Sequence, residues 1–388
     1  MNNLKLALNY RLKETYWLKR NCEELLCLTK QQLGLAMSDK KKLTTQQLLT
    51  ISKTINIPLS FFYKEIEEPE REEYVKIRIN NKNILNEKNE VEHIYATMIV
   101  CYNTIYKYIT NNYTIPKFNK ELISVIPDCF LINNNNEIYY CKENENIIKL
   151  MSDNFINFFD AKDKYFENFF NTLESNGIII FSFEDSTHSF NNAQFLLTQE
   201  NPIIFLNRKT KQIYKRIFLL EELSELLCCK KYGNKITLDK NLKRSFSYRT
   251  LLQDRLTNSI TTDFFNYQKI CRIIHAFNIT AECLLTRLKD YNRIDLDDYK
   301  IYELSKTIEK YYEQIHVKEI ENNKEFDNKK HNDVSTIINK VQSILNKTSK
   351  SWEYVANVIG LTHDDINRFC FDIDINKECT IENNLMFV

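Results

Sequence analysis

The sequence predicts an α+β fold that is mostly helical, with one small β-sheet in the middle of the chain. Apolar residues recur at helical spacing over most of the 388 residues. Runs rich in β-branched and aromatic residues, which favour strands, gather between residues 178 and 206. The chain is long enough for two or three domains with a sizeable core.

Composition is typical of a soluble globular protein. Hydrophobic residues make up 43% of the chain and charged residues 27%, and the formal net charge of +1 means that any DNA contact would need a local basic patch. The 4 glycines form neither a P-loop nor a G-x-G-x-x-G string. No secretory signal and no apolar run of roughly 20 residues is present, so we expect a cytoplasmic protein with no membrane contact.

The pattern divides the chain into four regions. Residues 1–66 indicate short helices, and residues 67–150 a charged connector followed by a mixed helical and hairpin region. Residues 151–295 combine helices with the predicted strands. Residues 296–388 are a helical C-terminal region with a helix-turn-helix-like hairpin at 351–370.

In the central region the sequence predicts a helix, three strands and a long helix. The first helix spans Tyr165 to Glu174, and Gly177 follows where a helix C-cap favours a left-handed residue. The long helix runs from about Lys211 to Lys231 and ends before Gly233. The three expected strands are Ile178–Phe183, Phe195–Leu197 and Ile203–Leu206.

The long helix contains the most informative motif, FLLEELSELL. In a helix of the form H-E-x-x-H, two histidines one turn apart hold zinc, and the glutamate between them activates the bound water. This chain has Glu221-Glu222-Leu223-Ser224-Glu225, so that Glu221 and Glu225 stand at the histidine positions and Glu222 at the water-activating position. Oxygen ligands suit magnesium, calcium or manganese better than zinc.

Four segments resemble the ImmA/IrrE family of metallopeptidases, in the order in which that family carries them. The resemblance implies a zincin-like central domain, and it implies control of a repressor, a stress response or a mobile element. The segments are LESNGIIIF (173–181), FNNAQFLLTQENPIIFLN (190–207), KRIFLLEELSELL (215–227) and KICRIIHAFNITAECLLTRLKDYNRID (269–295).

The residues at the metal-ligand positions differ from those of that family. Both histidines are replaced, and Lys240, Asn241 and Lys243 lie where the family has a glutamate as its third metal ligand. One interpretation is an inactive domain without a cofactor, in which the three glutamates form the solvated face of the helix. The alternative is one divalent metal, zinc or manganese, held by Glu221 and Glu225 with Glu222 as the general base.

Residues 28–63 resemble the XRE-type helix-turn-helix domain. Thr29 is suited to cap one of its helices, and Thr44 or Thr45 a second. Either Thr29–Met37 is its second helix, which leaves only Ser38–Lys42 for a recognition helix, or Thr29–Met37 is itself the recognition helix after a short turn. Lysines would bind phosphate and glutamines could reach base edges, whereas a helical docking domain would leave the same residues in solvent. The candidate DNA contacts are Lys30, Gln31, Gln32, Lys40, Lys41 and Lys42.

The C-terminal hairpin has a small residue, a turn glycine and a capping hydroxyl at helix-turn-helix spacing. Thr362 is the expected N-cap, and Asp364 and Asp365 follow in the first helical turn. Because those carboxylates repel phosphate, a hairpin that packs on neighbouring helices explains the pattern better than DNA binding.

Three functions are compatible with these observations. The first is a transcription-regulator-type protein whose peptidase-like domain is inactive and holds a protein partner or peptide in the former substrate cleft, with strand addition beside Ile203–Leu206 as its mode. The second is an active metallopeptidase that cleaves a repressor. The third is a DNA-binding repressor whose middle domain senses a small molecule.

Overall fold

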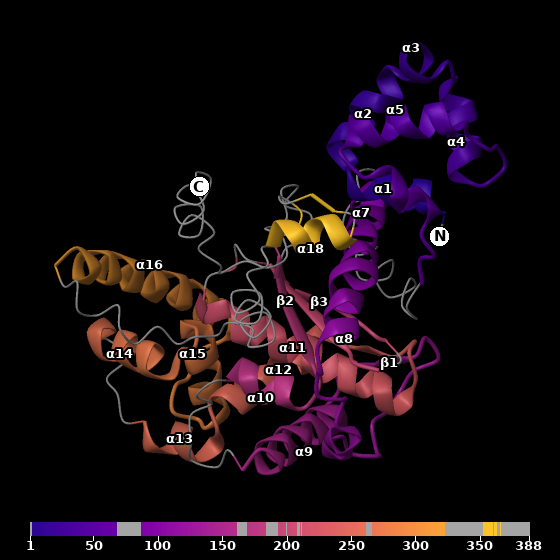
Figure 1. Cartoon of the computed structure of the whole chain (residues 1–388). Coiled ribbons are helices and arrows are strands. Elements are labelled where there is room, and N and C mark those ends of the chain that lie inside the picture. The colour runs from indigo at the N-terminus through magenta and orange to yellow at the C-terminus, as the bar shows by residue number, and fades with distance from the viewer. Residues whose placement is uncertain are drawn as a thin grey trace, which may run out of the picture. The chain divides into compact units, whose positions relative to one another are not determined.

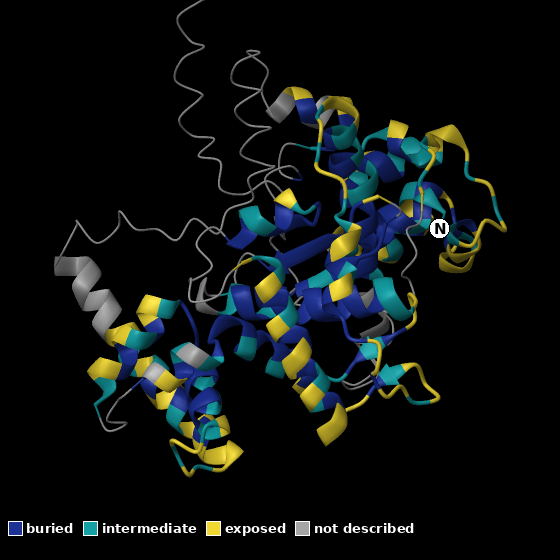
Figure 2. Cartoon of the chain, turned by 90° about the horizontal axis from the view of Figure 1, so that it is seen from below, coloured by how far each residue is buried: buried dark blue, intermediate teal, exposed yellow. Residues whose placement is uncertain are grey.

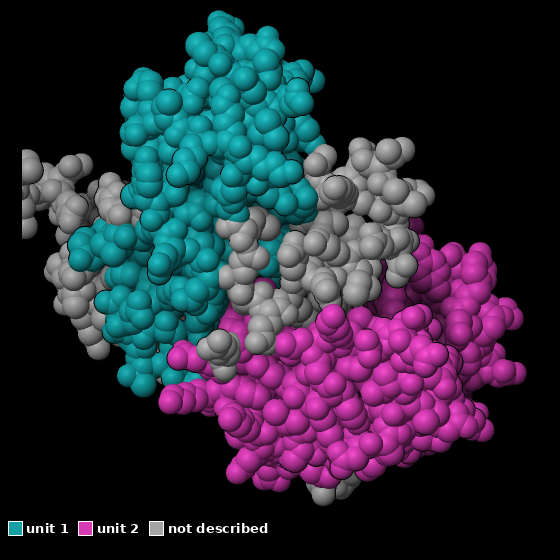
Figure 3. All heavy atoms as spheres, turned by 90° about the vertical axis from the view of Figure 1, so that its right-hand side faces the viewer, with its two compact units in different colours: residues 1–116, 179–191, 334–388 teal, residues 117–178, 192–333 magenta. Residues whose placement is uncertain are grey.

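The computed structural model describes residues 2–67, 87–160, 169–183, 193–198, 200–207, 210, 212–260, 266–322, 352–359, 361–362 and 365 (Figure 1). The chain forms two compact units (Figure 3). Unit 1 comprises residues 1–116, 179–191 and 334–388, and unit 2 comprises residues 117–178 and 192–333. Within the described part of the chain, no helix is both long and apolar enough to cross a membrane.

Unit 1 begins with short helices, of which α2, α4 and η1 contact α1. Their buried apolar residues include Leu6, Leu8, Leu18 and Ile51, and Figure 2 shows buried residues in dark blue. The elements are α1 (Asn3–Tyr10), α2 (Leu12–Arg20), α3 (Cys22–Leu26), α4 (Lys30–Met37), α5 (Thr45–Ile55) and η1 (Leu59–Tyr63).

Threonine side chains cap the N-termini of α4 and α5, as the sequence predicts. The hydroxyl of Thr29 accepts from the backbone N–H of Gln32, and the Gln32 side chain accepts from the backbone N–H of Thr29. Thr44 and Gln47 form the same reciprocal pair at the start of α5. Asn56 follows α5 in the left-handed conformation, with φ of 51°, a role that glycine fills in most proteins.

A long helical segment continues unit 1 as α7 (Glu87–Cys101), a π-helical turn η2 (Tyr102–Tyr106) and α8 (Lys107–Asn112). The π turn places Asn103 so that its side chain binds the chain at Glu67. The Asn103 Nδ2 donates to the Glu67 carbonyl at 2.8 Å, and its Oδ1 accepts from the Glu67 N–H at 2.9 Å. Both backbone groups of Glu67 are therefore held by one amide.

Part of the predicted C-terminal hairpin is described, and it includes α18 (Trp352–Ile359) of unit 1 and Asp365. Asp365 is 1% exposed. Its Oδ1 accepts from the Tyr10 hydroxyl at 2.7 Å and from Arg11 Nη2 at 2.5 Å. Its Oδ2 accepts from the backbone N–H and the hydroxyl of Thr362, and the Thr362 hydroxyl accepts from the Asp365 N–H. These are the contacts expected of Thr362 as an N-cap, and the predicted helix after it lies mostly outside the described residues. Asp365 is thus committed to internal contacts, whereas Asp364 lies outside the described residues.

Unit 2 is mostly helical, with short strands between its helices (Figure 1). Its central helix α11 begins and ends close to the predicted positions. The elements are η3 (Lys120–Val125), β1 (Glu137–Ile138), α9 (Lys142–Phe158), α10 (Phe169–Ser175), β3 (Ala193–Leu196), β4 (Ile203–Asn207), α11 (Gln212–Tyr232), β5 (Thr237–Leu238), α12 (Lys240–Leu251), α13 (Asp254–Ser259), α14 (Tyr267–Phe277), α15 (Ala281–Asp290) and α16 (Asp298–Asn322).

The β-rich runs of the sequence form the predicted strands. The strand β2 is Ile179–Phe183 of unit 1, and in unit 2 β3 pairs with β4 in antiparallel register. Strand addition beside Ile203–Leu206 stays a prediction. A second sheet joins β1 and β5 in parallel.

Gly177 ends α10 in the left-handed conformation predicted for it, with φ of 77°. The N–H of Ile178 donates to the carbonyl of Leu173, and the N–H of Gly177 donates to that of Glu174. These two bonds are the pattern of a Schellman motif. The Gly177 carbonyl accepts from Asn201 Nδ2 at 2.6 Å, so the turn is also tied to the loop before β4.

A buried arginine joins α15 to α13 and to the end of α12. The Arg287 side chain is 0% exposed. Its Nη1 binds Asp290 at 2.6 Å, its Nη2 binds Asp254 at 2.5 Å, and its Nε donates to the Leu252 carbonyl at 3.1 Å. All three guanidinium nitrogens of Arg287 therefore have hydrogen-bond acceptors, which compensate for the burial of this cation.

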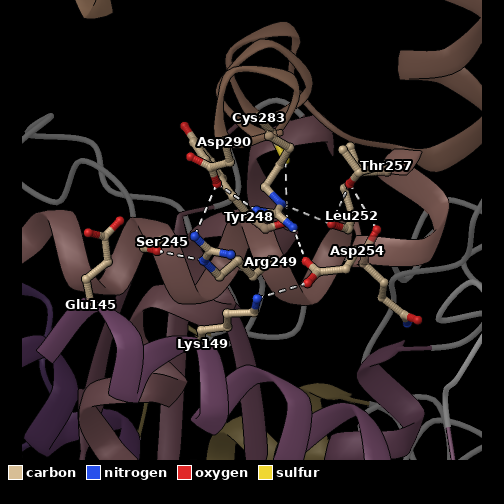
Figure 4. A network of polar contacts seen from close by, with 12 residues as sticks. Glu145, Lys149, Ser245, Tyr248, Arg249, Leu252, Asp254, Thr257, Cys283 and Asp290 are labelled. Atoms are coloured by element: carbon tan, nitrogen blue, oxygen red, sulfur yellow. Dashed lines mark hydrogen bonds and ion pairs between the residues drawn. The ribbon is translucent and has the colours of Figure 1, made fainter. Parts of the chain in front are cut away.

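Two outer cations extend this network (Figure 4). Arg249 of α12 lies 3.3 Å from Asp290, and Lys149 of α9 lies 3.5 Å from Asp254. The network thus connects four helices of unit 2.

The Asp254 contacts predict an acid-sensitive stabilisation of unit 2. Burial acts to raise the pKa of Asp254, but the hydrogen bond from Tyr291 and the charge of Arg287 outweigh it, so that the pKa lies below its usual value. A lowered folded-state pKa gives stability that is present above the unfolded value of about 3.9 and is lost as pH falls through the folded value. We expect Asp254→Asn to lower the unfolding temperature at pH 7 and to match the parent chain near pH 2.

The measurement is thermal unfolding by circular dichroism across that pH range. Asp298→Asn is the matched control, because Asp298 forms an exposed ion pair with Lys289 and surface pairs contribute little. An equal effect of the two substitutions at pH 7 would show that Asp254 adds no stability.

Candidate functional site

Helix α11 is buried on all sides along its middle. It packs against α12, β3, β4, β5 and η3, and every residue from 219 to 229 is buried. The prediction that the glutamates form a solvated face is therefore wrong. Neighbouring elements cover that face as well as the apolar one, which a helical pattern in one segment cannot show.

Three glutamates are consequently inside the protein. The exposed fractions are 5% for Glu221, 1% for Glu222 and 1% for Glu225. Glutamate is almost never fully buried unless it is paired, because transfer of a carboxylate out of water is costly. Since this burial occurs at the positions of an H-E-x-x-H motif, we take this cluster as the candidate site.

Helix α12 supplies cations to the two glutamates that share a face. Lys243 Nζ contacts Glu225 Oε2 in an ion pair whose side chains are 6% and 1% exposed. Arg244 Nε lies 3.6 Å from Glu221 Oε1, and Arg244 Nη1 lies 3.3 Å from Glu282 Oε1 on α15. The Arg244 side chain is 35% exposed, so this end of the cluster reaches solvent.

The side chains around Glu221 and Glu225 do not form a complete set of metal ligands. Lys243 occupies the segment in which the resembling family has its third ligand, and an ammonium has three donors and no acceptor. Among the described residues, no group of three His, Cys, Asp or Glu side chains could hold a metal. Glu221 and Glu225 as ligands, and Glu222 as a base, stay predictions.

Ser224 and Cys228, which lie beside the glutamates in α11, have structural roles. Ser224 donates to the carbonyl of Glu221 at 2.7 Å. Burial raises the pKa of the Cys228 thiol, and neighbouring Cys229 and Glu225 raise it further. A thiol with a raised pKa is a poor nucleophile, so Cys228 is a packing residue.

The candidate DNA contacts lie on α4 and on the loop after it. Lys30 and Gln31 are exposed, whereas Gln32 forms the cap with Thr29. In the loop, Lys40 and Lys42 are exposed and Lys41 is half-buried. The described residues 38–42 contain no helix, which favours α4 over this loop as any recognition helix; DNA contact itself stays a prediction.

Comparison with protein-family models, with curated proteins and with solved structures finds no match to this chain. The resemblance to the ImmA/IrrE and XRE families therefore stays a prediction that rests on the sequence segments.

The sequence carries a signal for the missed site residues. Lys243 and Arg244 are adjacent cations at the start of a helix whose Phe246 and Tyr248 are buried. A basic pair among core aromatics, one helix after three glutamates, indicates internal pairing.

Proposed function

We propose that this chain is a regulatory protein whose unit 2 is an inactive, peptidase-like scaffold that binds a protein partner or peptide. The observation that best supports this proposal is the Glu225–Lys243 ion pair. In it, the residue at the predicted second metal-ligand position contacts a protein cation. Without a metal to polarise a carbonyl and activate water, Glu222 has no reaction to serve.

The burial of the cluster supports a retained scaffold. A chain that needed only a stable helix would gain by placing apolar residues at Glu221, Glu222 and Glu225, since buried ion pairs are weak contributors to stability. Their presence inside the protein is explained if the helix derives from a functional one. The fold around the former site is then available for recognition.

Arg244 and Glu282 lie at the end of the glutamate cluster that solvent reaches. Their side chains are 35% and 27% exposed and lie 3.3 Å apart. Such a half-exposed pair can exchange an internal contact for one with a polar partner group. We therefore place the partner's contact at this end of the cluster, with α4 as a separate candidate for DNA.

The test joins an activity assay to a binding assay on the full chain. We expect no cleavage of a proteome-derived peptide pool above the background of Glu222→Gln, with zinc or manganese added. A photo-crosslinking amino acid at position 282 is expected to trap one reproducible protein in cells that express the chain. The same amino acid at exposed position 240 is the control.

Two outcomes would refute the proposal. Cleavage that requires Glu222 would make the chain a metallopeptidase. Crosslinks at position 282 that match those at position 240 would remove the evidence for a partner at this end of the cluster.

A further inference from the structure

The two carboxylates at the metal-ligand positions each face a cation of α12. Lys243 Nζ contacts Glu225 Oε2, and Arg244 Nε lies 3.6 Å from Glu221 Oε1. The two glutamates are one helical turn apart on α11, and the two cations are adjacent on α12. Each of these two carboxylates therefore has a cation of the next helix beside it, and Arg244 also contacts Glu282 of α15.

A divalent metal ion would supply the same compensation. Two buried carboxylates one turn apart repel each other unless a positive charge lies between or beside them. A metal provides that charge and accepts oxygen ligands. A protonated lysine provides it too, but as a donor with no lone pair, so it cannot join a ligand set.

The burial of Lys243 adds a second argument. Its ammonium contacts Glu225 from the next helix, and both side chains are almost fully buried. The position beside Glu225 that a cation would use is therefore already filled by a protein cation. The exposed fraction of 6% leaves Lys243 no alternative contact with solvent.

We propose that Lys243 takes the place of the metal ion and closes this site to divalent cations. The inference deepens the proposed function, because it names the reason why the scaffold is inactive. It also implies that the carboxylates retain an arrangement that a divalent cation can use once the lysine charge is removed.

The test is a titration of the full chain with Mn²⁺, which oxygen ligands favour, read by the electron paramagnetic resonance of free Mn²⁺. We expect no stoichiometric binding by the parent chain. Lys243→Gln is expected to bind one equivalent, at least roughly tenfold more tightly than the parent chain. Lys243→Glu, which adds a third carboxylate, is expected to bind more tightly still.

The controls separate this site from the surface. Lys240→Gln removes an exposed lysine from the start of the same helix and is expected to bind no Mn²⁺. Lys243→Arg keeps the charge and is also expected to bind none. Adding Glu225→Gln to Lys243→Gln is expected to abolish the gained binding.

Two results would overturn the inference. One is a parent chain that binds one equivalent of Mn²⁺ through Glu221 and Glu225, as shown by its loss in the double alanine variant. The other is a folded Lys243→Gln chain that binds none. If Lys243→Gln does not fold alone, recovery of its helical circular dichroism with Mn²⁺ would support the inference, and no recovery would overturn it.

The crosslinking result at position 282 does not depend on the Mn²⁺ result. A failure of this inference is therefore distinguishable from a failure of the proposed function.

Discussion

Replacing Lys243 by methionine is expected to reduce the stability of unit 2 by about 3–5 kcal/mol, because removal of one partner leaves a buried charge uncompensated. Glu225 is 1% exposed and cannot turn to water without opening the contact between α11 and α12. Methionine retains most of the lysine stem, so that packing changes little and the measured loss reports the charge.

Hydrogen exchange of the amides in α11 and α12 is the measurement, since it reports the opening of this region alone. Lys240→Met is the matched control at an exposed position of the same helix, and we expect it to change stability by no more than about 0.5 kcal/mol. Glu225→Gln in the Lys243→Met background should recover part of the loss, because it removes the unpaired charge. Equal effects of the two lysine substitutions would show that the ion pair contributes nothing.

Local chemistry made most elements predictable from the sequence. Thr29 and Thr44 each cap a helix with a hydroxyl contact of the expected kind. Gly177 has the left-handed conformation that the end of α10 requires. The β-rich runs near 178, 195 and 203 become β2, β3 and β4. All of these depend on residues close together in sequence.

The environment of α11 was not predictable in the same way. Its leucines and glutamates alternate with helical period, and in a single segment that pattern indicates one buried face and one solvated face. The glutamate face is instead covered by α12, whose Lys243 and Arg244 follow some twenty residues later. Which helix covers a face is decided by packing between distant segments, which a pattern in one segment does not contain.

A second large effect is expected from Gly177→Ala, which should cost about 3 kcal/mol or more. A left-handed backbone costs a residue with a Cβ about 1–2 kcal/mol, and overpacking adds about 1–3 kcal/mol. A Cβ at Gly177 would lie 2.4 Å from the Lys117 carbonyl carbon and 2.4 Å from the Phe118 nitrogen. Both are backbone atoms, so neither can rotate away.

Two other glycines separate the contributions to that cost. Gly233 has φ of 115° but nothing within 4 Å of a built Cβ, so Gly233→Ala should show the backbone cost alone. Gly34 is helical and equally open, so Gly34→Ala should stabilise α4 by up to about 1 kcal/mol. Hydrogen exchange in α10, α11 and α4 measures the three substitutions locally. If Gly177→Ala costs no more than Gly233→Ala, then the segment at Lys117 moves away readily, and the close approach is not what requires a glycine at the end of α10.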